Sequence, residues 1–82
     1  MIVKLFAIYD HKVGSYGQLM PFRSKGEAIR SFSDAVGDVK SDFCRHPEDY
    51  VLFQMAEYDD NSGLVVAGME PVITALELRK PE

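Results

Sequence analysis

The chain has 82 residues, of which 46% are hydrophobic and 11% aromatic, and its formal net charge is −4. This length predicts a single domain over residues 1–82, and the apolar content excludes a chain that is disordered throughout. The negative charge disfavours general nucleic-acid binding, since phosphate contacts dominate that affinity. A locally basic face is still possible, because residues 1–46 carry +2 and residues 47–82 carry −6.

Residues 2–9 form the first predicted element, a nearly continuous apolar run broken by Lys4. Such a run predicts a central strand that is buried on both faces. It is too short and too interrupted to span a membrane, and it lacks the basic start and cleavage site of a signal peptide. Cys44 is the only cysteine, so no internal disulfide can form, which suits a reducing cytoplasm. We therefore expect a cytoplasmic protein without a membrane partner.

Residues 10–17 contain two glycines and predict a turn region. Residues 18–23 then predict a short strand that returns beside the first one. Pro21 cannot donate a hydrogen bond to a neighbouring strand, so this segment is expected either at the edge of the sheet or as plain extended chain.

A capped helix is the most clearly patterned element. Ser24 is followed three residues later by Glu27, which is the capping-box pattern, and Gly37 is placed to end the helix in a left-handed conformation. Arg30 and Asp34 lie one turn apart and predict an ion pair. The apolar positions repeat with the helical period and predict one buried stripe, which comprises Ala28, Ile29, Phe32, Ala35 and Val36.

The next segments alternate between polar connections and regular structure. Residues 38–45 are predicted to form a polar connector, and Pro47 predicts a short helical turn over residues 46–49. Residues 51–58 and residues 64–67 predict a hairpin that is closed by the turn at 59–63. Residues 72–76 are a last apolar run, either a strand or an extended tail, and residues 78–82 are expected to fray.

These elements predict an α+β fold, a small antiparallel sheet of three to five strands with one main helix packed on one face. The alternative is a sheet that a second copy of the chain completes through an exposed strand edge. At this size, oligomerisation is a natural source of additional buried surface, and a dimer is the expected form.

No catalytic pattern is present in the sequence, so we expect no enzyme activity and no cofactor. Cys44 and His46 offer two metal-ligating groups, and His11 is the only other histidine, whereas a structural zinc site needs four ligands. We therefore predict no metal site. The acidic turn at 59–63 resembles the start of a calcium loop, but its glycine falls one position early, and a hairpin turn explains it better.

Nucleic-acid binding is the most specific function that the residue types suggest. Single-strand binders combine basic groups that contact phosphates with aromatic rings on which bases stack. In the first half of the chain, basic and aromatic residues are interleaved, and the helix start adds backbone amides that suit phosphate. The predicted nucleic-acid-binding residues are Arg23, Lys25, Arg30, Lys40, Arg45, Tyr9 and Tyr16.

Three ordered motifs, KLFAIYD, GEAIRSFSDAV and HPEDYVLFQMAEYDD, resemble the small non-structural protein of gokushovirus-type microviruses, which are single-stranded DNA phages. The resemblance runs from residue 4 to residue 63. It implies a protein made in the cytoplasm of an infected bacterium and associated with DNA binding or replication, and it supplies no established site residues. The chain departs from the pattern at residues 37–39, where related proteins tend to have Asn-Asp-Pro.

Two functional hypotheses follow. The first is a non-catalytic phage protein that binds single-stranded DNA during genome replication or packaging. The second is a homo-oligomeric protein that acts on a phage or host protein, such as a replication protein, without nucleic acid. A contiguous basic groove would favour the first hypothesis, and scattered basic residues beside an exposed apolar patch would favour the second.

Overall fold

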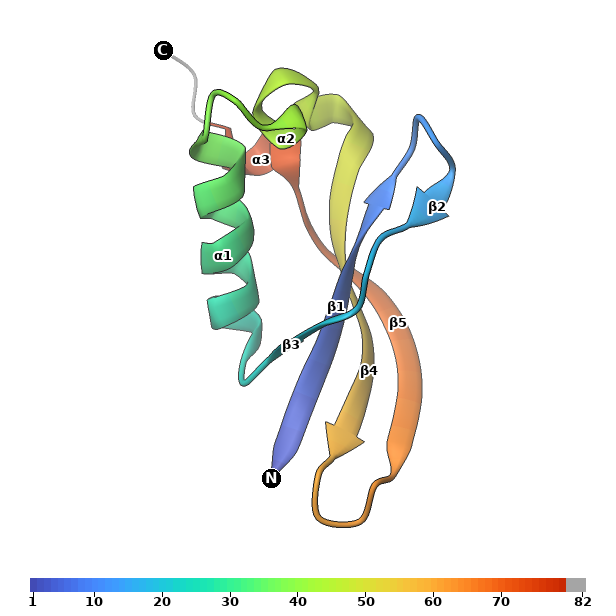
Figure 1. The fold of residues 1–82 in the computed structure, drawn as a ribbon. Helices are drawn as coiled ribbons and strands as arrows, with labels where there is room; N and C mark the ends of the chain where they lie inside the picture. Colours follow the sequence, from blue (N-terminus) through green and yellow to red (C-terminus); the bar gives the residue numbers. More distant parts are fainter. Residues whose placement is uncertain (80–82) are drawn as a thin grey trace.

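The computed structural model describes residues 1–79 and forms a five-stranded antiparallel sheet with a helix packed against it (Figure 1). The α+β prediction is therefore confirmed. In chain order the elements are β1 (Ile2–Asp10), β2 (Ser15–Tyr16), β3 (Met20–Phe22), α1 (Lys25–Gly37), α2 (Asp42–Arg45), the 3-10 helix η1 (Pro47–Asp49), β4 (Tyr50–Asp59), β5 (Val65–Thr74) and α3 (Ala75–Leu78).

The strand β1 lies at the centre of the sheet. One of its edges pairs with β4, and the other pairs with β2 near one end and with β3 near the other. The strand β5 pairs with β4 and forms the opposite edge of the sheet. The predicted return strand with Pro21 is confirmed as an edge strand, while β2 lies within the segment that was predicted to be only a turn.

The helix α1 begins at the predicted cap. The Oγ of Ser24 accepts a hydrogen bond from the backbone N–H of Glu27 at 3.2 Å. The reciprocal half of the capping box differs from the prediction, because the Glu27 carboxylate accepts from the N–H of Arg23 at 3.0 Å. The prediction that Gly37 ends α1 in a left-handed conformation is wrong: Gly37 is the last helical residue, and the cap is Asp38 in an extended conformation.

The predicted helical stripe forms the hydrophobic core against one face of the sheet. Ala28, Phe32 and Val36 are buried, and Ile29 packs beside them. From the sheet, Phe6 and Leu52 meet this stripe, and both are essentially inaccessible to solvent. Full burial of such side chains is worth roughly 1.5–3 kcal/mol each, so this contact holds α1 on the sheet.

Three segments beyond α1 differ from their predictions. The predicted polar connector contains α2, whose first turn is capped by the Ser41 hydroxyl accepting from the N–H of Cys44. The strand β5 continues through Pro71 to Thr74 as one edge strand, because a residue at an edge needs no N–H for a further neighbour. Leu78 ends α3 and packs on the core, so it does not fray, while residues 80–82 of the predicted frayed end lie outside the described part.

The predicted hairpin turn is confirmed. The N–H of Gly63 donates to the carbonyl of Asp59 at 2.7 Å, and Gly63 has a φ of 78°, which favours glycine. The Asp59 carboxylate accepts the N–H of Asn61 at 2.9 Å within the turn, and it also lies 3.8 Å from the Met1 ammonium. The short turn predicted after residue 46 is also confirmed as η1.

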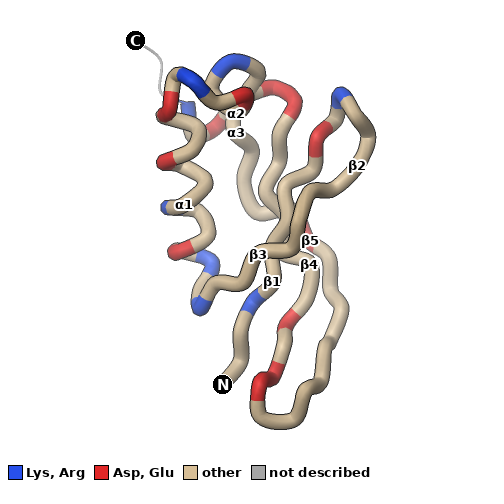
Figure 2. Tube along the Cα trace, viewed as in Figure 1, with Lys and Arg blue, Asp and Glu red and all other residues tan. Residues whose placement is uncertain are grey.

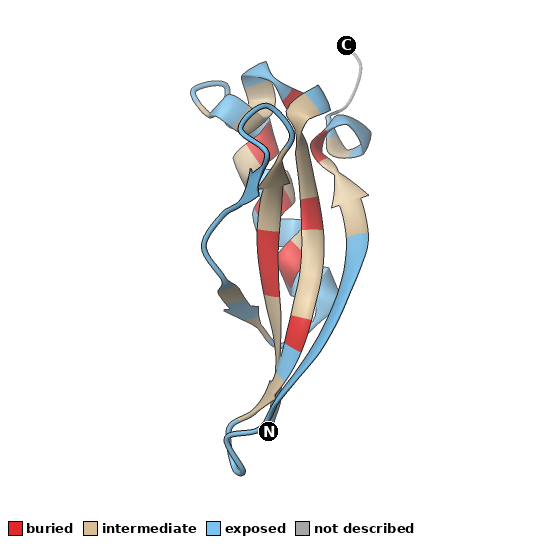
Figure 3. Ribbon diagram, turned by 90° about the vertical axis from the view of Figure 1, so that its right-hand side faces the viewer, coloured by how far each residue is buried: buried red, intermediate tan, exposed pale blue. Residues whose placement is uncertain are grey.

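The helix covers only part of the sheet. The molecule measures 46 × 24 × 18 Å, and the strands continue past the start of α1 toward the hairpin turn (Figure 1). Figure 3 shows that buried residues gather in the half of β1 and β4 that lies over α1, whereas the β5 half nearest the turn is exposed. The prediction that β1 is buried on both faces is confirmed only at the centre of the strand, where the neighbouring Phe6 and Ala7 are both buried. The rest of β1 is half-buried or exposed, because a helix covers only one face of the sheet.

Candidate functional site

The face of the sheet opposite α1, which we call the open face, carries no charged residue among the strand residues that the structure describes. Side chains opposite each other in the strand register share a face, and the core residues Phe6, Ile8 and Leu52 point to the other one. The register therefore assigns the following residues to the open face: Val3, Leu5, Ala7 and Tyr9 of β1, Tyr16 of β2, Pro21 of β3, Val51, Phe53, Ala56 and Tyr58 of β4, and Val65, Ala67, Pro71 and Thr74 of β5.

Aromatic rings gather at one end of the open face. Tyr9 and Tyr16 have ring centroids 4.7 Å apart, and both contact Phe53, at 6.3 and 5.4 Å. His11 packs edge-on against Tyr9 at 4.9 Å. Tyr16 keeps 40% of its surface exposed. The two tyrosines that were predicted as stacking groups are thus brought together, and this cluster offers ring surface to a ligand from solvent.

Three of the five predicted basic residues lie near the start of α1 (Figure 2). Arg23 follows β3 directly, and Lys25 and Arg30 belong to the first two turns of α1. Lys4 joins them, because it lies opposite Phe22 in the sheet register. The Lys25 ammonium is 3.4 Å from the Glu70 carboxylate of β5, in an ion pair that is exposed and therefore weak.

The other two predicted basic residues lie at the opposite end of the molecule (Figure 2). Lys40 is in the exposed loop after α1, and Arg45 pairs with Asp42 at 2.6 Å within α2. The structure therefore does not place all five basic residues together. The predicted ion pair between Arg30 and Asp34 is not among the ion pairs that residues 1–79 form.

A hollow of about 430 Å³ beside α2 is strongly acidic. Its lining contains four carboxylates against one lysine and one histidine, and consists of Asp10, Lys12, Asp42, His46, Glu48, Asp49 and Tyr50. Partial burial raises the pKa of the Tyr50 phenol above its ordinary value, and the neighbouring Asp10, Asp42 and Asp49 carboxylates raise it further. This end of the molecule therefore repels phosphate, which weakens the case for Lys40 and Arg45 as DNA contacts.

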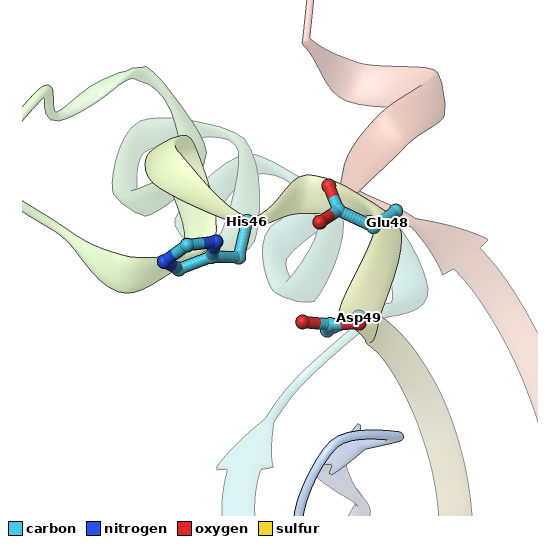
Figure 4. Close-up of side chains that lie close together, drawn as sticks. All are labelled: His46, Glu48 and Asp49. Carbon is cyan, nitrogen blue, oxygen red and sulfur yellow. The ribbon is translucent and has the colours of Figure 1, made fainter.

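His46, Glu48 and Asp49 approach one another on the rim of this hollow (Figure 4). Their potential ligand atoms lie within 4.8 Å of each other, and His46 and Glu48 are exposed. One nitrogen and two carboxylate oxygens are a possible donor set for a divalent cation. Neither Cys44 nor His11, the other residues weighed from the sequence, belongs to this group. Exposed acidic groups of this kind are common without an ion, so we assign no metal site here.

A second hollow, of about 350 Å³, lies next to the acidic one and is mainly apolar. It separates the β1–β2 turn from α2, and its lining includes Ile8, Val13, Met20, Phe43 and Tyr50. Phe43 and Tyr50 meet edge-on there at 4.7 Å. Phe43, one of the interleaved aromatics of the sequence, therefore belongs to the wall of this hollow and to the core beside Phe32.

Two contributors to the candidate site were missed from the sequence. Phe53 completes the aromatic cluster, and Lys4 extends the basic group. The alternation of β4 assigns Phe53 to the same face as Val51, but the sequence does not show which face the helix leaves uncovered. Lys4 joins Arg23 only through the pairing of β1 with β3, which the sequence does not specify.

Comparison with known proteins gives one clear family. Residues 3–78 match the family model described as Phage ORF5 protein. The chain is also 39% identical over 79 residues to Protein ORF5 of Chlamydia phage 1, an alignment that covers 88% of this chain and 82% of that protein. Neither name specifies an activity.

No solved structure matches the chain significantly. Within residues 1–79, no helix is both long enough and apolar enough to cross a membrane.

Proposed function

Because the chain belongs to the Phage ORF5 protein family, we propose that it binds single-stranded DNA during replication or packaging of a phage genome. The membership confirms the expected small phage protein of the microvirus type. The observation that carries the proposal is the Tyr9–Tyr16–Phe53 cluster, which gathers three rings on an uncovered, charge-free sheet face. Base stacking on such rings is worth roughly 1–3 kcal/mol per base and tolerates any base.

The proposed path for the strand follows the β2–β3 edge of the sheet. Tyr16 stands at one end of this edge, and Arg23 directly follows the other end. The chain between them can span at most roughly 25 Å, a distance that a short stretch of single strand can follow. Bases would stack on Tyr9 and Tyr16, and phosphates would contact Arg23, Lys25 and Arg30, supplemented by Lys4.

This proposal agrees with the charge distribution. The open face itself has no basic residue to hold phosphate, so the phosphates must be neutralised beside it, near the start of α1. Asp10, which follows Tyr9 in β1, lines the acidic hollow, so at the aromatic end of the sheet the strand would contact the protein through its bases and keep its phosphates away from that hollow. The proposed site therefore omits Lys40 and Arg45, whose role remains a prediction from the sequence. It requires no cofactor and no catalytic group.

A labelled single-stranded oligonucleotide, titrated with the protein at low salt and followed by fluorescence anisotropy, tests this proposal. We expect Tyr16→Ala to weaken binding roughly 5- to 150-fold, the equivalent of one lost base stack. The Lys25→Ala/Arg30→Ala pair should weaken binding and reduce the slope of log affinity against log salt by about 0.7 per lost phosphate contact. Arg79→Ala removes one positive charge far from the proposed site, half of the charge that the pair removes, and is the control for the effect of each lost charge.

The absence of any anisotropy change with the wild-type protein at low salt would refute DNA binding. Equal losses for Arg79→Ala and for the variants near α1 would show a nonspecific charge effect without a site. A duplex of the same sequence, titrated in parallel, separates a preference for single strands from general affinity for phosphate.

A second candidate function is favoured by a different observation, the lack of charge across the entire open face. An uncovered apolar face beside scattered basic residues is typical of a protein–protein interface. In this case the chain would act on a phage or host replication protein without nucleic acid. Capture of bound proteins from a nuclease-treated lysate of infected bacteria tests this second function. The Phe53→Lys variant should fail to retain the partner protein. Retention of that partner by Phe53→Lys would contradict it.

A further inference from the structure

The strand β5 forms a long unprotected edge of the sheet. It has ten residues, within residues 1–79 it pairs only with β4, and the residues from Val65 to Pro71 are all exposed. Its free edge presents backbone N–H and C=O groups that no described segment satisfies. Natural proteins usually protect such an edge with charges, bulges, proline or a covering segment.

The half of β5 next to the hairpin turn lacks charge, proline and a covering segment among the described residues, and its one irregularity is the register shift against β4 at residues 68–69. No charged residue occurs from Asn61 to Met69, and the charge and the proline that limit the edge, Glu70 and Pro71, follow only after that stretch. Its large apolar side chains are more than half exposed, with Leu64 at 63%, Val65 at 56%, Val66 at 57% and Met69 at 58%. This segment, residues 64–69, is here called the β5 edge.

We propose that the β5 edge pairs with the β5 edge of a second copy of the chain, so that the two sheets join into one continuous sheet. A two-fold axis perpendicular to the sheet makes the two edges antiparallel and brings identical segments together. Any charge within the segment would then lie near the same charge of the second copy, which is unfavourable. Because residues 61–69 contain no charged residue, two copies of this segment can pair without repulsion between like charges.

The side chains along the β5 edge also favour a second copy of the chain as its partner. In a regular antiparallel ladder, an axis at Ala67 would place Val65 opposite Met69 of the second copy, and Val66 opposite its Gly68. Residues 68–69, where β5 shifts register against β4, would have to straighten to join that ladder. A side chain has room beside Gly68, since a Cβ added there would meet no atom within 4 Å. Apolar groups would thus meet on both faces of the seam, the line along which the two β5 edges pair, and α1 does not reach this line.

The size of the seam sets the expected affinity. Six residues at ~3.3 Å each span about 20 Å, and one strand pair of that length buries less than the ~800 Å² per partner of a standard interface. We therefore expect a reversible dimer whose population rises with concentration. The pairing does not depend on DNA binding, because Tyr9 and Tyr16 lie on β1 and β2, across the sheet from β5, and Phe53 pairs with Pro71, which lies outside the β5 edge.

Sedimentation velocity of the full chain, without nucleic acid and from the micromolar to the millimolar range, tests the pairing. The wild-type protein should shift from monomer to dimer as the concentration rises. Val66→Lys should weaken the dimer up to about 5-fold, because it places two like charges near each other where the two β5 edges meet. Val39→Lys introduces the same charge at a position of similar or greater exposure away from the edge, and it should dimerise as the wild type does.

A second variant, Met69→Lys, keeps the test decisive if Val66→Lys fails to fold, which circular dichroism would reveal. A wild-type protein that stays monomeric over the whole range would overturn the proposal. So would dimerisation of both lysine variants at wild-type strength, or growth beyond the dimer, since a two-fold pairing closes on itself. Because no oligonucleotide is present, these outcomes are independent of the DNA-binding titration.

Discussion

At the scale of single residues, a few polar side chains determine where helices begin, and one leaves a buried hydrogen-bond acceptor unsatisfied. Ser24 begins α1 by accepting the N–H of Glu27, and Ser41 begins α2 in the same way. Gln54 is the opposite case. Its Oε1 is buried and has no hydrogen-bond partner among the described residues, so the folded state leaves an acceptor unsatisfied.

Replacing the helix cap should lower stability by a defined amount. Ser24→Ala removes the acceptor for the Glu27 N–H and should reduce the free energy of unfolding by about 1 kcal/mol. Urea denaturation measures this change. Ser31→Ala, at an exposed position inside α1, is the matched control and should change stability by only a few tenths of a kcal/mol, since alanine is the better helix former. An equal loss in both variants would show that the hydroxyl has no capping role.

Replacing Gln54 should have the opposite sign. Gln54→Met keeps the unbranched shape and removes the unsatisfied buried acceptor, so it should raise the free energy of unfolding by about 1 kcal/mol. Gln18→Met, in the exposed linker between β2 and β3, should leave stability nearly unchanged. A loss of stability in Gln54→Met would indicate that a water or another partner satisfies the Gln54 amide.

At the scale of elements, the two faces of the sheet differ because only one of them carries a helix. Phe32 of α1 is 3% exposed and packs edge-on against Phe43 at 5.6 Å. Phe53 of β4 has a similar size but lies on the open face, where it is only partly buried. The same substitution on the two faces therefore measures what the helix contributes.

Phe32→Ala should cost about 3–5 kcal/mol of unfolding free energy, because it opens a cavity in the core between α1 and the sheet. Phe53→Ala should cost clearly less, since its ring already contacts water in the monomer. Denaturation at low protein concentration compares the two variants. An equal cost would mean that something covers the open face even in the dilute protein.

The cap of the short helix α3 should make the free energy of unfolding depend on pH in the acidic range. Its capping box contains Glu77, whose carboxylate accepts hydrogen bonds from the Thr74 N–H and hydroxyl, at 3.0 Å each. These bonds lower the pKa of Glu77 below its ordinary 4.5. The N–H of Asn61 similarly lowers the pKa of Asp59 below 3.8.

Because both pKa values are lower in the folded state, these carboxylates stabilise the fold fully above pH 4.5. Their contribution is lost as the pH falls through the lowered values. We therefore expect the melting temperature to fall on acidification in this window, and Glu77→Gln to flatten part of the decline. Glu48→Gln, at an exposed position in η1, is the control and should leave the decline of the melting temperature at acid pH unchanged. A Glu77→Gln profile identical to the wild type would contradict the role of Glu77.

At the scale of the whole molecule, stability should be unequal along the long axis. The buried residues of β1 and β4 gather beside α1, while the hairpin half near residues 59–65 has no helix on either face (Figure 3). Regions with few buried contacts open locally, whereas core regions exchange only through global unfolding.

Amide hydrogen exchange should show this gradient. At low protein concentration, the amides around Phe6 and Leu52 should exchange most slowly, and those of β4 and β5 near the hairpin turn should exchange faster. Uniform protection over both halves would contradict the gradient. The control is the same measurement on Phe32→Ala, in which the slow amides near α1 should lose more protection than the already fast ones.

The sequence alone determined the local features whose causes are local. The Ser24 cap, the stripe from Ala28 to Val36, the edge position of the strand with Pro21 and the turn closed by Gly63 all follow from spacing, side-chain chemistry and backbone preference. The three ordered motifs also identified the phage family. Errors occurred where tertiary contacts override local preference, as at Gly37, in the full length of β5 and in the α3 helix.

Only the tertiary structure decided which residues meet. Strand pairing brought Tyr9 and Tyr16 together with Phe53 and separated them from Lys40 and Arg45. Among the described residues, it also left one sheet face without a helix and one edge of β5 without a neighbouring strand. These outcomes depend on contacts between residues far apart in the chain. Such contacts are set by the register and by the side on which α1 packs, and neither has a local signature in the sequence.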